Sequence, residues 1–305
     1  MKHLISLYDL TVEETEEILK LSGKLKKELK QGIQHHILKG KTLGMIFSKS
    51  STRTRVSFET GMYQLGGHAL FLSSNDIQLG RGESIYDTAQ VLSRYIDGIM
   101  IRTFKQSDVE DLAKYGSIPV INGLTDLMHP CQILADLFTI YEHKGTLKGL
   151  KVAYLGDGNN VANSLLHGCA KLGVNISVAS PEGYKCDPQI VEEALSDAKK
   201  SGSEIVLTED PVEAIKDADA VYTDTWVSMG QESEKEQRIK TFMPYQVNKE
   251  LFSKAKEDAI FLHCLPAYRG YEVTAEVIDG PQSVIFDEAE NRLHVQKAIM
   301  ALLMK

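Results

Sequence analysis

The order of apolar and amphipathic segments constrains the fold of this chain more than any other feature. Short apolar runs that predict strands alternate with segments whose apolar residues recur at helical spacing, and the alternation occurs twice. In the first half, strands are expected near 42–47, 69–72, 99–101 and 119–121, with helices at 11–30, 57–66, 83–96, 107–115 and 131–143. In the second half, strands are expected at 152–155, 175–179, 204–207, 220–223, 260–263 and 284–286, with helices at 161–172, 188–200, 211–217, 246–257 and 287–304. This alternation predicts two α/β domains, each built on a parallel sheet.

The boundary between the two domains is expected between Lys144 and Leu150, because a long helix is expected to end at Gly145 and the alternation restarts afterwards. Further along, the polar segment 229–243 shows no apolar periodicity and is too long for a simple connection. We therefore expect a mobile functional loop there.

Composition excludes several classes of protein. The net charge of -8 disfavours a general binder of nucleic acid or of membrane surfaces. Four cysteines occur without a C-x-x-C pair, which indicates reduced thiols in the cytoplasm rather than a disulfide framework or a zinc site. The N-terminal residues lack the apolar core of a signal peptide, and no apolar run is long enough to span a bilayer.

The segment Ser50-Ser51-Thr52-Arg53-Thr54-Arg55 places four hydroxyls and two guanidiniums between an expected strand and an expected helix. The unpaired N–H groups and the positive dipole end of a helix start attract anions, and arginine donors suit phosphate oxygens. A helix cap needs only one Ser or Thr. The whole set therefore predicts a phosphate site rather than a solvated run of charges.

Two better-known phosphate-binding patterns are incomplete in this chain. Gly40-Lys41-Thr42 resembles the end of a Walker A loop, but His35 stands where the first glycine is required, and the strand follows the motif. Gly156-Asp157-Gly158 follows an expected strand as a dinucleotide fingerprint does, but Val161 replaces the third glycine. The loop after this strand suits a small polar ligand, and a nicotinamide enzyme remains a minor alternative.

Several polar residues lie at or just beyond the carboxyl ends of expected strands. Arg102 and Asp224 each follow an apolar run, and His263-Cys264-Leu265-Pro266 ends another, while His129 precedes a helix that starts with Pro130. Taken singly, His129 and Asp224 could be helix caps and Cys264 could be inert packing. Because ligands bind beyond the carboxyl ends of strands in open α/β sheets, their shared position predicts ligand-binding edges.

Together these motifs resemble those of the aspartate/ornithine carbamoyltransferase family over essentially the whole chain. The residues that carry the resemblance are Ser51-Thr52-Arg53-Thr54, Arg102, His129-Pro130-Cys131-Gln132, Asn160, Asp224, Ser228-Met229-Gly230, His263-Cys264-Leu265-Pro266 and Arg292. Within the family, the Ser-Met-Gly and His-Cys-Leu-Pro segments point to ornithine rather than aspartate. The region from Ser73 to Glu83 contains Gln78 but no lysine, whereas the aspartate enzymes carry a lysine in the matching loop.

The resemblance implies transfer of the carbamoyl group of carbamoyl phosphate to the side-chain amine of L-ornithine, which gives L-citrulline and phosphate without metal or cofactor. This is a step of the arginine-biosynthesis or urea-cycle type, and the sequence leaves open whether it runs biosynthetically or in arginine breakdown. Arg102, His129 and Cys264 are implied as catalytic residues. The residues implied to bind carbamoyl phosphate are Ser51, Thr52, Arg53, Thr54, Gln78, Arg102, His129, Gln132, Cys264, Leu265 and Arg292. Those implied to bind ornithine are Asn160, Asp224, Ser228 and Met229.

The resemblance also implies a carbamoyl phosphate domain at 1–145, an ornithine domain at 146–289, and a C-terminal helix at 290–305 that packs back on the first domain. It implies a cytoplasmic homotrimer with shared active sites, in which Gln78 reaches a neighbour's site and the 229–243 loop closes over ornithine. No nucleic acid or membrane partner is expected. A transferase for acetylornithine or putrescine is the nearest alternative, and a non-catalytic phosphate- or amino-acid-binding regulator is another.

Overall fold

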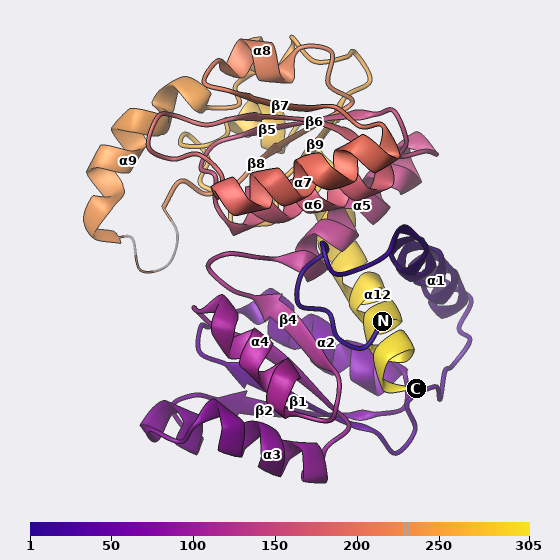
Figure 1. Cartoon of the computed structure of the whole chain (residues 1–305). Helices are drawn as coiled ribbons and strands as arrows, with labels where there is room; N and C mark the ends of the chain where they lie inside the picture. The colour runs from indigo at the N-terminus through magenta and orange to yellow at the C-terminus, as the bar shows by residue number, and fades with distance from the viewer. Residues whose placement is uncertain (228–229, 231) are drawn as a thin grey trace. The chain divides into compact units, whose positions relative to one another are not determined.

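The computed structural model describes residues 1–227, 230 and 232–305, shown in Figure 1. The chain divides into two units of dense internal contacts. Unit 1 comprises Met1–Phe138 and Glu290–Lys305, and unit 2 comprises Thr139–Ala289. Both units contain a parallel sheet with helices, which confirms the predicted α/β class. Within the described part of the chain, no helix combines the length and apolar composition needed to cross a membrane.

Unit 1 is built on a four-stranded parallel sheet in the order β2-β1-β3-β4. Its strands are β1 (Thr42–Phe47), β2 (His68–Ser73), β3 (Gly98–Arg102) and β4 (Val120–Leu124). Its helices are α1 (Val12–Lys30), α2 (Thr52–Gln64), η1 (Gln78–Arg81), α3 (Ile85–Tyr95), α4 (Gln106–Tyr115), most of α5 (Pro130–Lys144) and the last part of α12 (Ile285–Met304).

Apolar side chains on both faces of this sheet hold the helices of unit 1 in place. On one face, Ile46, Ile99 and their neighbours pack with α3 and α4 residues such as Ala89 and Leu112. On the other, a Cβ added at Gly98 would lie 3.0 Å from the sulfur of Met304, so this glycine lets α12 lie close to β3. The continuously buried patterns of β1 and β3 are typical of parallel strands covered on both faces.

Unit 2 is built on a five-stranded parallel sheet in the order β7-β6-β5-β8-β9. Its strands are β5 (Lys151–Leu155), β6 (Asn175–Ala179), β7 (Ile205–Thr208), β8 (Ala220–Thr223) and β9 (Ile260–Leu262). Its helices are α6 (Asn160–Leu172), α7 (Pro188–Ser201), α8 (Pro211–Ile215), η2 (Glu232–Glu234), α9 (Lys235–Phe242), η3 (Met243–Tyr245), α10 (Lys249–Phe252) and α11 (Ala275–Ile278).

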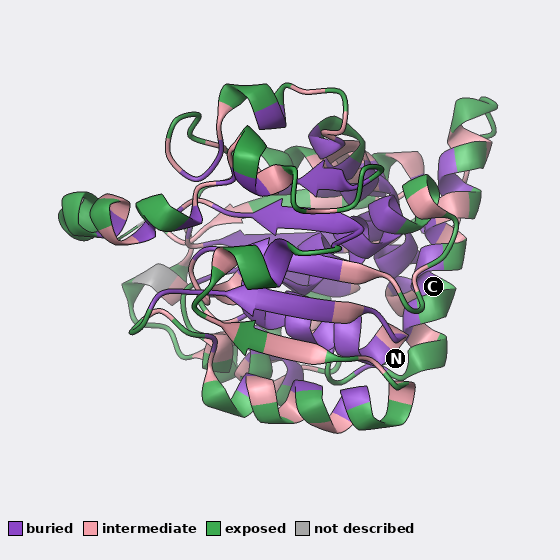
Figure 2. Ribbon diagram, turned by 90° about the horizontal axis from the view of Figure 1, so that it is seen from above, coloured by how far each residue is buried: buried purple, intermediate pink, exposed green. Residues whose placement is uncertain are grey.

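Figure 1 shows α6 and α7 side by side along one face of this sheet. Side chains of the strands, such as Leu155 and Phe261, form a core with Ile215 of α8, Leu251 of α10 and Val277 of α11. Figure 2 shows that the central strands are largely buried, whereas helices such as α1, α3 and α7 alternate between buried and exposed residues.

Each sheet has a point where successive crossovers run to opposite sides. In unit 1 this point lies between the neighbouring strands β1 and β3, and in unit 2 it lies between β5 and β8. The loops that leave the carboxyl ends of such strands diverge and open a crevice, where ligands bind in open α/β sheets. The chain therefore has one candidate ligand-binding edge in each unit.

Three expectations about the second half of the chain were wrong. The run at 284–286 is not a strand, because Ile285 begins α12 and only Ser283 makes an isolated bridge, to Phe261. Three apolar residues fit either structure, and the long helix decides between them. The expected loop at 229–243 contains η2, α9 and part of η3. The expected helix at 246–257 is reduced to the four residues of α10.

Candidate active site

The predicted anion site of unit 1 lies at the start of α2, directly after β1. Ser51 is the N-cap, and its hydroxyl accepts a hydrogen bond from the backbone N–H of Thr54 at 3.2 Å. The helix therefore begins at Thr52 rather than near residue 57. Its first turn carries Arg53 and no acidic residue, so the positive end of the helix dipole is not neutralised there. Arg55, in contrast, lies over the Phe71 ring and pairs with Glu59 on the surface.

Arg292 connects this helix start to α5. Its guanidinium donates to the side-chain oxygen of Gln132 and, at 3.5 Å, to the hydroxyl of Thr54. The other end of the Gln132 amide donates to Asp136 at 2.8 Å, so both ends of that amide are fixed. All of these side chains are buried. The structure thus brings Ser51, Thr54, Gln132 and Arg292 together in unit 1.

His129 and Arg102 belong to the same unit. Arg102 is the last residue of β3, and His129 lies immediately before α5 with 6% of its surface exposed. Burial, followed by the nearby charges of Arg292, Arg102 and Arg53, holds the pKa of His129 well below its usual value of 6.5. At neutral pH the imidazole is therefore uncharged and can donate from one ring nitrogen. Gln78, the first residue of η1, is exposed.

In unit 2, Asp224 follows β8 at the carboxyl end of the sheet and is 6% exposed. One carboxylate oxygen accepts from the N–H of Thr225 at 2.7 Å and from the thiol of Cys264 at 3.1 Å. The other oxygen accepts from the amide nitrogen of Asn159 at 2.8 Å. Asn160, the next residue, begins α6. A carboxylate held in this way suits an ammonium group, because it presents a negative charge in a fixed direction.

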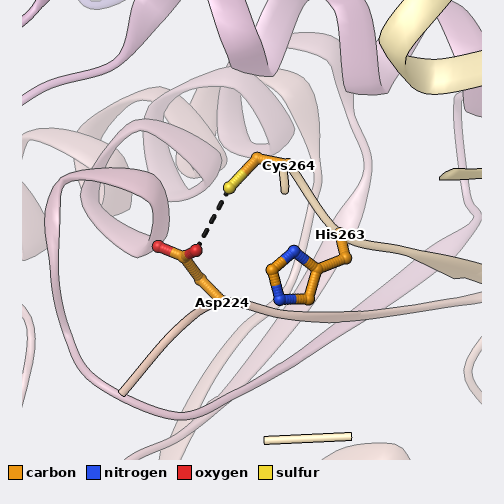
Figure 3. A group of neighbouring side chains, drawn as sticks. All are labelled: Asp224, His263 and Cys264. Atoms are coloured by element: carbon orange, nitrogen blue, oxygen red, sulfur yellow. Dashed lines mark hydrogen bonds between the residues drawn. The ribbon is translucent and has the colours of Figure 1, made fainter. Parts of the chain in front are cut away.

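Asp224, His263 and Cys264 place ligand-type atoms within 4.8 Å of one another, as Figure 3 shows, so a metal site has to be considered. Both imidazole nitrogens are already engaged, however. Nδ1 of His263 accepts from the N–H of Leu265 at 2.9 Å, and Nε2 lies 3.2 Å from Glu272. Since a metal would have to displace one of these bonds, the donor set fits the orientation of the loop after β9 better than metal binding.

Leu265 has a φ of 58°, in the left-handed region. This conformation costs a non-glycine residue about 1–3 kcal/mol and persists where the surrounding structure fixes it, often beside ligands. Here the fixing contact is the hydrogen bond from its N–H to the buried His263. Ser228 and Met229, the remaining predicted ornithine ligands, lie outside the described residues.

The structure adds a partly buried ion pair that the sequence analysis missed. Arg238 of α9 donates to the carboxylate of Asp157 and to the backbone oxygen of Trp226, and its guanidinium lies 4.8 Å from the centre of the Tyr184 ring. Burial raises the pKa of Asp157 to about 6, against the opposing effect of Arg238. The pair joins the loop after β5 to the segment after β8. The only sequence signal was the i, i+4 spacing of Arg238 and Phe242, the two buried residues of α9.

The resemblance of the loop after β5 to a dinucleotide fingerprint has a structural explanation. A Cβ added at Gly158 would collide with the backbone of Lys185 and Cys186. This glycine is therefore required by the approach of the chain's own backbone, and a bound pyrophosphate is not needed to explain it.

The basic, hydroxyl-rich helix start of unit 1 suits an anion such as a phosphate, and the fixed carboxylate of unit 2 suits an ammonium group. Comparison with known proteins agrees. The family model for the aspartate/ornithine carbamoyltransferase carbamoyl-P binding domain matches residues 2–142, and the model for the Asp/Orn binding domain matches residues 148–303. The chain belongs to the aspartate/ornithine carbamoyltransferase family.

Individual relatives are similar over nearly their full lengths. The chain is 63% identical over 303 residues to an ornithine carbamoyltransferase of Caldicellulosiruptor saccharolyticus, which covers 99% of this chain and 98% of that protein. It is 58% identical to the anabolic ornithine carbamoyltransferase of Pyrococcus furiosus, covering 99% and 96% respectively. The solved structure of an ornithine carbamoyltransferase from the same organism has a TM-score of 0.97 at 58% identity, covering 99% and 97% of the two chains.

Proposed function

We propose that this protein transfers the carbamoyl group from carbamoyl phosphate to the side-chain amine of L-ornithine and releases L-citrulline and phosphate. The observation that carries the proposal is the carboxylate of Asp224. It is fixed by three hydrogen bonds at the switch point of the unit that matches the Asp/Orn binding domain. The name ornithine carbamoyltransferase that the relatives carry supports ornithine as the acceptor.

Residues 1–145 and the C-terminal helix 290–305 form the part that binds carbamoyl phosphate in this proposal. Ser51, Thr52, Arg53 and Thr54 hold the phosphate at the start of α2, and Arg102 also reaches it. Gln132, whose amide is fixed by Arg292 and Asp136, binds the carbamoyl amide. The backbone oxygen of Leu265 is its second partner.

Catalysis in this proposal depends on donors directed at the carbonyl oxygen of the carbamoyl group. Negative charge grows on that oxygen as the amine attacks, so donors already in position lower the barrier. Thr54, Arg102 and His129 supply them. His129 acts as a neutral donor, because its pKa is held well below 6.5. Carbamoyl phosphate is already activated, so the transfer itself calls for no cofactor.

Residues 146–289 bind ornithine in this proposal. Asp224 pairs with the α-ammonium group, while Asn160, Ser228 and Met229 take the α-carboxylate end. The side-chain amine has a reference pKa of about 10.4, like lysine, and must lose a proton before it attacks. Removal from water and the cationic groups around carbamoyl phosphate favour its neutral form. Cys264, whose thiol donates to Asp224, orients this amine.

The biosynthetic direction, a cytoplasmic location and a homotrimer complete the proposal. The relative from Pyrococcus furiosus is named an anabolic enzyme, which supports the first. The surface of unit 1 supports an assembly, because the edge strand β2 exposes Leu70 and Phe71, and Tyr63 and Tyr95 are 82% and 76% exposed. Large apolar side chains on an edge strand and its neighbouring helices are candidates for burial in an interface. The exposed Gln78 then reaches a neighbour's site.

The test is an assay of carbamoyl transfer from carbamoyl phosphate with ornithine, acetylornithine, putrescine and aspartate in parallel, on one enzyme preparation. Rapid formation of citrulline with ornithine alone is the expected result. Turnover with another amine only would overturn the assignment of Asp224 and Asn160 while leaving the phosphate site intact. Ligand binding without any turnover would favour the regulator that the sequence left open.

A further inference from the structure

Asn159 connects two elements of the ornithine unit, and its amide can be oriented from its contacts. Its oxygen accepts from the N–H groups of Val161 at 2.9 Å and Ala162 at 3.2 Å, and the phenol of Tyr154 lies 3.3 Å away. Its nitrogen donates to Asp224 at 2.8 Å. Because N–H groups can only donate and a carboxylate oxygen accepts, these neighbours fix which end of the amide is which.

Those contacts join the segments that follow β5 and β8, the two strands that flank the switch point. The oxygen of Asn159 caps α6, whose first residue is Asn160, and its nitrogen holds the carboxylate of Asp224 after β8. A carboxylate offers about four acceptor positions. Among the residues that the structure describes, the N–H of Thr225, the thiol of Cys264 and the amide of Asn159 occupy three of them, which leaves a fourth for a ligand.

We infer that Asn159 is a positioning residue that sets the distance and angle between Asp224 and Asn160, and thereby the fit of the α-ammonium and α-carboxylate groups of the acceptor. This inference rests on the proposed function, in which those two residues hold opposite ends of the amino-acid head group. Asn159 does not touch the substrate. It acts by fixing the two groups that do, and the side-chain amine held at the carbamoyl group is the third point that distinguishes one hand of the amino acid from the other.

The decisive variant is Asn159→Ser, because serine also caps helices but is too short to donate to Asp224. Loss of one hydrogen bond to a charged group corresponds to a rise of roughly ten- to hundredfold in KM for L-ornithine. The preference for L- over D-ornithine should fall with it. The affinity for carbamoyl phosphate, measured by calorimetry, should stay close to that of the wild type, because the phosphate residues of unit 1 are untouched. The melting temperature should fall less than in Asn159→Ala, because serine keeps the cap of α6.

Two further variants separate positioning from helix capping. Asn159→Ala removes both contacts and should lower the melting temperature as well as raising KM for ornithine. Asp187→Ala removes the matching cap of α7, where Asp187 accepts from Gln189 and Ile190, and should lower the melting temperature alone. An unchanged KM in Asn159→Ser, or the same rise in KM in Asp187→Ala, would overturn the inference. A wild-type enzyme that does not use ornithine would instead refute the proposed function.

Discussion

The sharpest prediction concerns Asp224→Asn, which keeps the shape of the side chain and removes its charge. In the wild type, three donors converge on the carboxylate. The asparagine amide can accept through its oxygen only, so its nitrogen must face one of these donors. A buried donor left without a partner costs about 1–3 kcal/mol, and the melting temperature should fall accordingly.

The larger effect is on ornithine. A buried charge that loses its partner costs about 3–5 kcal/mol, and each 1.4 kcal/mol corresponds to about a factor of ten. Asp224→Asn should therefore raise KM for ornithine at least about a hundredfold. The affinity for carbamoyl phosphate should hold, because its phosphate-binding residues belong to unit 1. Steady-state kinetics with ornithine varied, together with calorimetry of carbamoyl phosphate, measure the two quantities.

Asp219→Asn is the matched control. Asp219 and Asp224 flank the two ends of β8, and Asp219 is also buried, accepting from the N–H of Lys151 at 2.8 Å and from the ammonium of Lys256 at 2.7 Å. It lies at the amino end of the strand, away from the candidate site. This variant should lose stability and keep its KM for ornithine. A normal ornithine dependence in Asp224→Asn, or an equal defect in Asp219→Asn, would refute the reasoning.

Three further predictions follow from local contacts and titrations. Because the pKa of His129 lies well below 6.5, its imidazole should contribute no ionisation to the pH–rate profile above that pH. His129→Asn, which keeps a neutral donor, should retain more activity than His129→Ala. A wild-type rate that titrates with His129 near pH 6.5 would contradict this expectation. The pKa of Asp157 in the folded protein, about 6, exceeds its unfolded value of 3.8, so its contribution to stability is present below pH 3.8 and is lost as the pH rises to about 6. Denaturant titrations at several pH values should show the free energy of unfolding fall over this range in the wild type and change less in Asp157→Asn. Thr11 and Glu14 form a reciprocal capping box on α1. Thr11→Ala should therefore lower the free energy of unfolding, measured with denaturant, by about 1 kcal/mol, and Thr11→Ser should lower it less. Equal effects of the two variants would argue against the cap.

Features that depend on neighbours in the chain were predictable from the sequence. Thr11 caps the first helix, which was expected at 11–30, and its partner Glu14 lies only three residues away. Arg102 and Asp224 lie at strand ends, since an apolar run followed by a polar residue marks such an end. In a parallel sheet all these ends point the same way, so the polar residues that follow the strands could be grouped into binding edges from their sequence positions alone.

Features that depend on distant contacts were not predictable. Arg292 reaches Gln132 across 160 residues of sequence, and Asn159 reaches Asp224 across 65. Arg238 lies in a segment whose composition reads as a loop, because only two of its helical positions are buried and one of them is charged. Its burial is explained by Asp157, Trp226 and Tyr184, which the local sequence around α9 does not contain.

The position of the transferred group tests the central claim most directly. Carbamoyl phosphate labelled at its carbonyl carbon would be mixed with ornithine and enzyme, and the labelled product identified by NMR. The labelled carbamoyl group is expected on the side-chain nitrogen of ornithine, because Asp224 holds the α-ammonium group. A label on the α-nitrogen, or no labelled ornithine product while carbamoyl phosphate is consumed, would contradict it.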